Sequence, residues 1–135
     1  MLQVTQKVRL VEYIPSSQMD AKGKPVKDAA VFIYRGIKRR EYLRINELLK
    51  TDIDGNVKMS DIELGYELTA LALESVKNVQ VESDKDGSIL PLVIEHGEDG
   101  NVLPEILDLF SPRDLAEVGL EIIRAANPTE EQGEK

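Results

Sequence analysis

Oxygen-bearing side chains whose types and spacing suit a divalent cation occur in residues 52–63, which read DIDGNVKMSDIE. Counted along this stretch, Asp52, Asp54 and Asn56 occupy positions one, three and five, and Glu63 occupies position twelve. A calcium loop between two helices places its ligands at this spacing, because a hard cation needs clustered carboxylate and carbonyl oxygens. The stretch therefore gives the hypothesis of a calcium-binding module.

Position six of the stretch argues against an EF-hand loop. The loop turns sharply there, which glycine permits, but Val57 occupies the position. A β-branched residue at positive φ is strongly disfavoured. Residues 84–95 repeat the ligand spacing with Asp84, Asp86, Ser88 and Glu95. That second copy also lacks the glycine, because Ile89 stands at position six, and it carries Pro91 inside the loop.

Ordinary turns and a helix cap explain the same residues without an ion. The Asp-Gly pairs at 54–55 and 86–87 are typical of turns. Ser60 and Glu63 have the spacing of a capping box at the start of a helix. We therefore expect no cofactor and no metal, and we keep one alternative, which is calcium bound by Asp52, Asp54, Asn56 and Glu63.

No other residues form a recognisable catalytic constellation. His96 is the only histidine, it lies beside Gly97, and the chain has no cysteine. We therefore interpret His96 as a loop residue rather than a metal ligand. No serine stands in a nucleophile-elbow pattern, and no glycine-rich phosphate loop is present. We expect a protein that is not an enzyme.

Composition and charge narrow the possible partners. The 135 residues are 41% hydrophobic and 31% charged, with a formal net charge of −8, which is typical of a globular domain. An acidic surface repels a phosphate backbone, so we expect no nucleic-acid binding. No apolar run approaches the roughly 20 residues needed to cross a bilayer, and no signal peptide is evident. We expect no membrane contact and a cytoplasmic location.

The pattern of expected strands and helices predicts one α+β domain over residues 1–128 and a disordered C-terminal tail over 129–135. Residues 4–14 alternate in polarity and residues 29–34 are rich in β-formers, so they predict an N-terminal antiparallel β-hairpin. A small bundle of about four helices is expected to follow. The helices are predicted at these positions: 38–50, 60–76, 103–110 and from 112 to the Asn-Pro pair at 127–128.

The second of these helices carries apolar residues on more than one face, and the last carries Leu120 and Ile123 beside its apolar stripe. We therefore expect surplus apolar surface that binds a partner. Gly65 and Gly119 lie inside the two helices, and each has two interpretations, loose tolerance or a close approach between helices. The predicted partner-binding residues are Leu64, Leu68, Leu71, Leu115, Val118 and Ile122. Each of them also suits an ordinary core position.

The order of features resembles the tail assembly chaperones of long-tailed bacteriophages and prophages. The resemblance is carried by residues 32–42 (FIYRGIKRREY), by residues 111–119 (SPRDLAEVG) and by residues 127–131 (NPTEE). It implies a non-enzymatic protein that binds the apolar tape measure protein during tail assembly, with the tail tube protein as a possible second partner. It also implies a homo-oligomer in the cytoplasm of the bacterial host. The remaining alternative is a structural virion component, such as a connector or tail-completion subunit.

Overall fold

The computed structural model describes residues 1–3, 9–48 and 60–126. These residues contain both strands and helices, so the predicted α+β class is confirmed. The elements follow one another in this order: β1 (Leu10–Tyr13), the 3-10 turn η1 (Ser16–Gln18), β2 (Val31–Arg35), α1 (Arg39–Leu48), α2 (Asp61–Ala72), β3 (Leu73–Lys77), β4 (Gln80–Glu82), β5 (Ile89–Pro91), α3 (Pro104–Leu107) and α4 (Pro112–Ala126).

The central sheet has three antiparallel strands in the order β1-β2-β3. The predicted hairpin of β1 and β2 is therefore present, with Tyr13 opposite Phe32 and Val11 opposite Tyr34. These four side chains belong to the hydrophobic core or pack against it. Strand alternation sends the neighbouring side chains to the opposite face of the sheet, where Leu10 is exposed.

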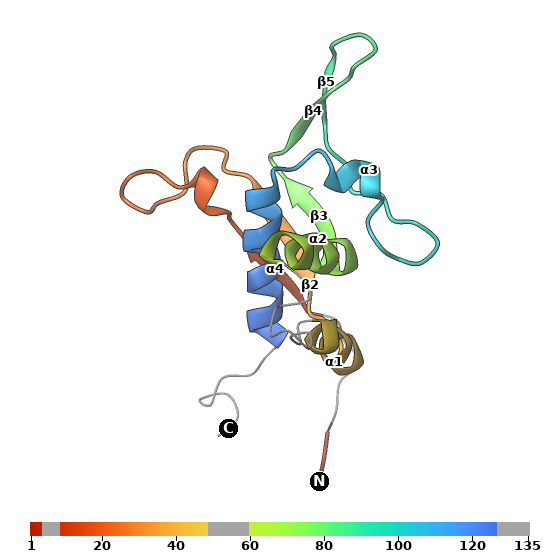
Figure 1. Ribbon diagram of the computed structural model, residues 1–135. Helices are drawn as coiled ribbons and strands as arrows, with labels where there is room; N and C mark the ends of the chain where they lie inside the picture. Colours follow the sequence, from red (N-terminus) through yellow and green to blue (C-terminus); the bar gives the residue numbers. More distant parts are fainter. Residues whose placement is uncertain (4–8, 49–59, 127–135) are drawn as a thin grey trace.

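Two helices, α2 and α4, cover the inner face of the sheet and cross each other there (Figure 1). The crossing is close because it is built on Gly65 and Gly119. A Cβ atom at Gly65 would lie 2.5 Å from the Leu115 carbonyl oxygen, and a Cβ at Gly119 would lie 2.5 Å from the Gly65 Cα. The buried Thr69 hydroxyl also donates to the Leu115 carbonyl at 3.4 Å. The close-approach interpretation of both glycines is therefore correct, and the approach is within the chain.

The second predicted helix is too long, because the chain changes structure at Leu73. Helix α2 ends at Ala72, and Leu73 begins β3 with no loop between them. Leu73 and Val76 fit the apolar stripe of a longer helix, but they pair with β2 instead, opposite Tyr34 and Phe32. Four helices are present in the described residues, as expected. They do not form a simple bundle, because α2 and α4 pack on a sheet and α3 is a single turn.

Residues 78–103 contain a second antiparallel hairpin that the sequence did not predict. Strands β4 and β5 pair with Val81 opposite Leu90, and the turn between them contains Gly87 at a φ of 72°. The hairpin extends away from the body of the molecule, as Figure 1 shows. We call residues 79–93 the arm. Between the arm and α3, His96 forms an isolated bridge with Val102.

Helix α1 is fastened to the rest of the chain by Arg35. Its guanidinium forms a bidentate pair with Glu41, at 2.9 and 3.0 Å, and donates to the Leu71 carbonyl at 3.2 Å. The same carboxylate accepts from the Lys38 backbone N–H at 2.8 Å, so it also satisfies a free donor at the start of α1. These hydrogen bonds and the Arg35 guanidinium lower the pKa of Glu41 although burial opposes the shift.

No helix within 9–48 or 60–126 is long and apolar enough to span a membrane.

Candidate functional site

The first calcium hypothesis falls mainly on residues that the structure does not describe. Asp52, Asp54 and Asn56 lie outside the described residues, so their geometry stays untested. Glu63 is described, and it belongs to the N-cap of α2. Its backbone N–H donates to the Ser60 Oγ at 3.2 Å, and the Ser60 hydroxyl donates to the Glu63 Oε1 at 3.3 Å. The N-cap at Ser60, which is one half of the predicted capping box, is therefore confirmed.

The second calcium-like stretch, residues 84–95, is not an ion-binding loop. It supplies the turn of the arm, in which the Asp86 carboxylate accepts from the backbone N–H and the hydroxyl of Ser88 at 3.0 and 2.7 Å. These two hydrogen bonds lower the pKa of Asp86. Ile89 and Pro91 then belong to β5. Across the described part of the chain, no group of three or more His, Cys, Asp or Glu residues is placed to hold a metal ion.

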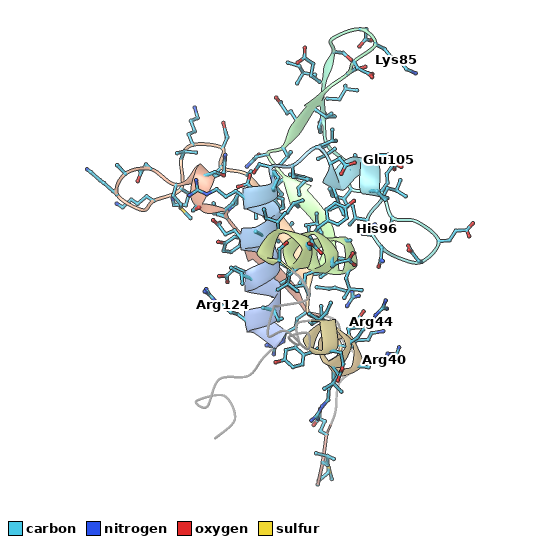
Figure 2. All side chains as sticks on the ribbon, in the orientation of Figure 1. Arg40, Arg44, Lys85, His96, Glu105 and Arg124 are labelled. Atoms are coloured by element: carbon cyan, nitrogen blue, oxygen red, sulfur yellow. The ribbon has the colours of Figure 1, made fainter. Side chains whose placement is uncertain are left out.

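His96 has a structural contact in place of a catalytic partner. Its Nε2 lies 2.9 Å from the Leu73 carbonyl oxygen, at the junction of α2 and β3. Nearby, the Val102 N–H donates to the Ala70 carbonyl at 2.8 Å, near the C-terminal end of α2. Both contacts tie residues 95–103 to carbonyl groups at the end of α2 and the start of β3. The ring is visible beside α2 in Figure 2.

Five of the six residues predicted to bind a partner lie in the chain's own hydrophobic core. Leu71 is partly buried. The other five are buried, namely Leu64, Leu68, Leu115, Val118 and Ile122. They fill the space between α2, α4 and the sheet. A partner cannot reach the five buried side chains in this conformation, whereas Leu71 lines a surface pocket.

Exposed apolar side chains gather instead where the arm meets α3. Leu90 is 57% exposed, Val93 is 69% exposed and Leu109 is 57% exposed. Together they line a groove of about 420 Å³ that runs between the arm and α3. The groove's other apolar residues include Val81, Leu103 and Ile106. The side chains of Leu90 and Val81 share one face of the arm, because these residues are directly paired across β4 and β5.

Carboxylates border this groove. Glu95 and Glu105 line it, and Glu105 lies on α3 near the base of the arm in Figure 2. We call the whole surface the acid-rimmed groove. No lysine or arginine is among the described residues that line it. Leu103 also lines a neighbouring hollow of about 560 Å³, whose lining residues include Tyr66, Glu67, Glu98 and Asp99.

The pKa of Tyr66, which lies among these carboxylates, reflects their negative charge. Burial raises the pKa of Tyr66, and the negative charges of Asp108, Glu67 and Glu105 raise it further. A phenol surrounded by carboxylates resists ionisation because its own negative charge would be repelled. The hollow beside Tyr66 is therefore electronegative, and the acid-rimmed groove carries carboxylates of the same sign, so both favour a positively charged partner.

The sequence contained a signal for the groove. Residues 89–94 (ILPLVI) are strongly apolar. Pro91 and the acidic residues on both sides are typical of a protected edge strand at the surface rather than of a core strand. These residues alone do not predict a groove, because the groove forms only where α3 lies beside the arm.

Comparison of the chain with models of protein families, with curated proteins and with solved structures finds no match.

Proposed function

We propose that this protein is a non-enzymatic chaperone that binds an apolar segment of another polypeptide through the acid-rimmed groove. Specifically, we propose a tail assembly chaperone of a long-tailed phage or prophage, with the tape measure protein as its client. The observation that carries the proposal is the exposure of Leu90, Val93 and Leu109 around one groove. Exposed apolar residues scattered singly are ordinary, but a contiguous group bordered by polar residues is typical of an interaction site.

The construction of the arm supports this proposal. A two-stranded hairpin is marginally stable in water unless another element covers it. Along β5, Ile89 and Leu90 are both exposed. A client that covered this strand would bury apolar surface that the free protein leaves in water, which is the main source of free energy in protein association. The charge of −8 keeps such complexes dispersed.

The resemblance to tail assembly chaperones is the second support, and the matching residues have clear structural roles. In the 32–42 segment, Arg35 and Glu41 form the bidentate pair that joins strand to helix. In the 111–119 segment, the Ser111 Oγ accepts from the Asp114 backbone N–H at 3.1 Å and so caps α4. These roles serve the fold. The client, the oligomeric state and the bacterial cytoplasm belong to the proposal.

The proposal is tested by co-expressing the chain with a candidate tape measure protein. We expect the soluble fraction of the tape measure protein to rise several-fold, and we expect the chaperone to be absent from purified phage particles. A tape measure protein that stays insoluble would count against the chaperone function. Recovery of the chain as a stoichiometric part of finished particles would identify it as a structural virion component instead.

A further inference from the structure

We infer that the client segment held by the acid-rimmed groove is an amphipathic helix with a positively charged polar face. Its apolar side chains would contact Leu90, Val93 and Leu109, and its lysine or arginine side chains would lie against Glu95 and Glu105. This inference rests on the proposed function, because it specifies the chemistry of the segment that the chaperone binds.

The backbone of β5 favours a helix over an added strand. Strand addition needs a row of free N–H and C=O groups along the edge of the sheet. The Leu92 N–H donates to the Val79 carbonyl, so it points inward, toward β4. Backbone N–H groups of successive residues in a strand point in opposite directions, so the backbone nitrogen of Pro91 points to the outer edge of β5. Proline has no N–H, so this edge lacks its central donor. At the β5 edge, which faces the groove, recognition therefore comes from side chains, as when an amphipathic helix docks in a groove.

Charge complementarity determines the sign of the polar face. Glu95 and Glu105 border the apolar surface, and Glu67, Glu98 and Asp99 line the adjoining hollow. The described residues that line both hollows include no basic side chain to neutralise them. Lys85 is on the turn at the outer end of the arm (Figure 2). A negatively charged segment would be repelled, whereas a basic segment gains favourable interactions at the rim of the interface.

The same charges argue against a second copy of the chain as the occupant. Each copy carries a net charge of −8, so two copies repel each other as whole molecules. The basic residues Arg40 and Arg44 lie on α1, at the opposite end of the molecule from the arm (Figure 2). In the described part of α1, Leu43 is the exposed large apolar residue. A single leucine would fill little of a groove that presents several apolar side chains.

The test uses the full-length protein and a fluorescently labelled helical peptide in which leucine recurs at helical spacing and the other positions are lysine. We expect saturable binding by fluorescence anisotropy at physiological ionic strength. We also expect much weaker binding of a peptide with glutamate in place of lysine, and of a scrambled peptide of the same composition. Equal binding of the ordered and scrambled lysine peptides would overturn the inference, because it would show attraction between charges without a groove.

Two variants with matched exposure locate the apolar contact. Leu109→Asp is expected to weaken peptide binding by at least about tenfold, as loss of an interface anchor does. Leu43→Asp serves as the control, because Leu43 is 54% exposed and Leu109 is 57% exposed, while Leu43 lies on α1 away from the groove. Both variants should fold, since neither side chain is buried. Equal affinities of the two variants would overturn the assignment of the groove.

Two charge variants with the same net charge test the rim. Replacing Glu95 and Glu105 with glutamine should weaken lysine-peptide binding by about three- to tenfold and reduce its dependence on salt. Replacing Glu12 and Glu74 with glutamine removes the same charge from exposed positions on β1 and β3, and it should change the affinity less than twofold. Equal losses in the two variants would overturn the predicted role of the rim.

The remaining outcomes separate this inference from the proposed function. If the tape measure protein is kept soluble but no lysine-rich helical peptide binds, the function stands and the inference fails. If the peptide binds but no tape measure protein is kept soluble, the groove chemistry stands and the proposed function fails. Sedimentation of the protein alone tests whether a second copy of the chain occupies the groove. Self-association that Leu109→Asp abolishes would assign the groove to another copy and overturn the inference.

Discussion

At the scale of single residues, Gly65 and Gly119 set the distance between α2 and α4. The atoms that a methyl group at Gly65 would meet are backbone atoms of Leu115 and Ala116. A side chain can rotate away from a new neighbour, but backbone atoms inside a helix cannot move without shifting the whole helix. The close crossing therefore depends on the absence of side chains at these two positions.

Gly65→Ala should destabilise the protein by about 1–3 kcal/mol, the range typical of overpacking, because the added methyl group forces the two helices apart. Gly36→Ala is the control, since a Cβ at Gly36 meets nothing within 4 Å. The control should change the free energy of unfolding by less than about 0.5 kcal/mol. Urea unfolding measures both variants. A Gly65→Ala variant as stable as the wild type would show that the helix crossing can accommodate a methyl group, which would contradict the close packing.

Glu117 is the residue that ties the N-terminal strand to α4. Its carboxylate accepts from the Tyr13 hydroxyl and the Ser16 backbone N–H, each at 2.6 Å, and from the Ser16 hydroxyl. Burial raises the pKa of Glu117, but these hydrogen bonds outweigh burial and lower it below 4.5. The carboxylate also adds to burial in raising the pKa of Tyr13. Because the folded state lowers the pKa of Glu117, its ionised form stabilises the fold.

The stabilisation from Glu117 should be complete above the ordinary pKa of 4.5 and should be lost as the pH falls through the lowered folded-state value. Glu117→Gln removes this pH dependence. The difference in unfolding free energy between wild type and variant, about 1–2 kcal/mol at pH 7, should shrink as the pH is lowered. Chemical denaturation between about pH 7 and pH 3 measures it. A difference that stays constant with pH would exclude the carboxylate as its origin.

At the scale of the elements, the Arg35 side chain joins α1 to the sheet and to α2, in addition to the packing of Ile45 in the core. Arg35 leaves β2, contacts Glu41 in the first turn of α1, and reaches the Leu71 carbonyl near the end of α2. A lysine has the same charge but cannot form the bidentate pair and reach the carbonyl at once. The position therefore requires arginine.

Arg35→Lys should loosen α1 more than the rest of the fold. Hydrogen exchange of the α1 amides should become about five- to thirtyfold faster, which corresponds to about 1–2 kcal/mol for a partly exposed charged hydrogen-bond network. Exchange in α2 and α4 should change little. Lys77→Arg is a conservative control, because Lys77 forms an exposed pair with Glu12 at 3.0 Å and such pairs contribute little. Uniformly faster exchange throughout the protein would contradict a local role for Arg35.

Some of the helices and strands could be predicted from the sequence, and others could not. Local chemistry predicted the β1–β2 pairing and the cap at Ser60 correctly. The end of α2 could not be predicted in this way, because Leu73 and Val76 suit a helix stripe as well as a strand. Pairing with β2, which is distant in sequence, decides between the two. The groove escaped prediction for a similar reason, since it exists only where the arm and α3 come together.

At the scale of the whole molecule, the buried core, the acid-rimmed groove and the basic side chains of α1 lie in different places (Figure 2). The core residues lie between the sheet, α2 and α4, whereas the exposed apolar groove lies at the arm, bordered by carboxylates. Arg40 and Arg44 project from α1 at the opposite end (Figure 2). The sequence predicted that apolar residues would bind a partner, but it placed them on α2 and α4. Folding uses five of those six residues for the chain's own core, and the shorter, less regular segments form the acid-rimmed groove.

The absence of a loop between α2 and β3 has a mechanical consequence. Force applied to the arm by a bound chain passes through β3 directly into the end of α2, because Ala72 and Leu73 are consecutive residues of the helix and the strand. The hydrogen bonds of His96 and Val102 meet the chain at the same point. A pull on the client would therefore load the pairing of β3 with β2 and the helix–strand junction before it reached the crossing of α2 with α4.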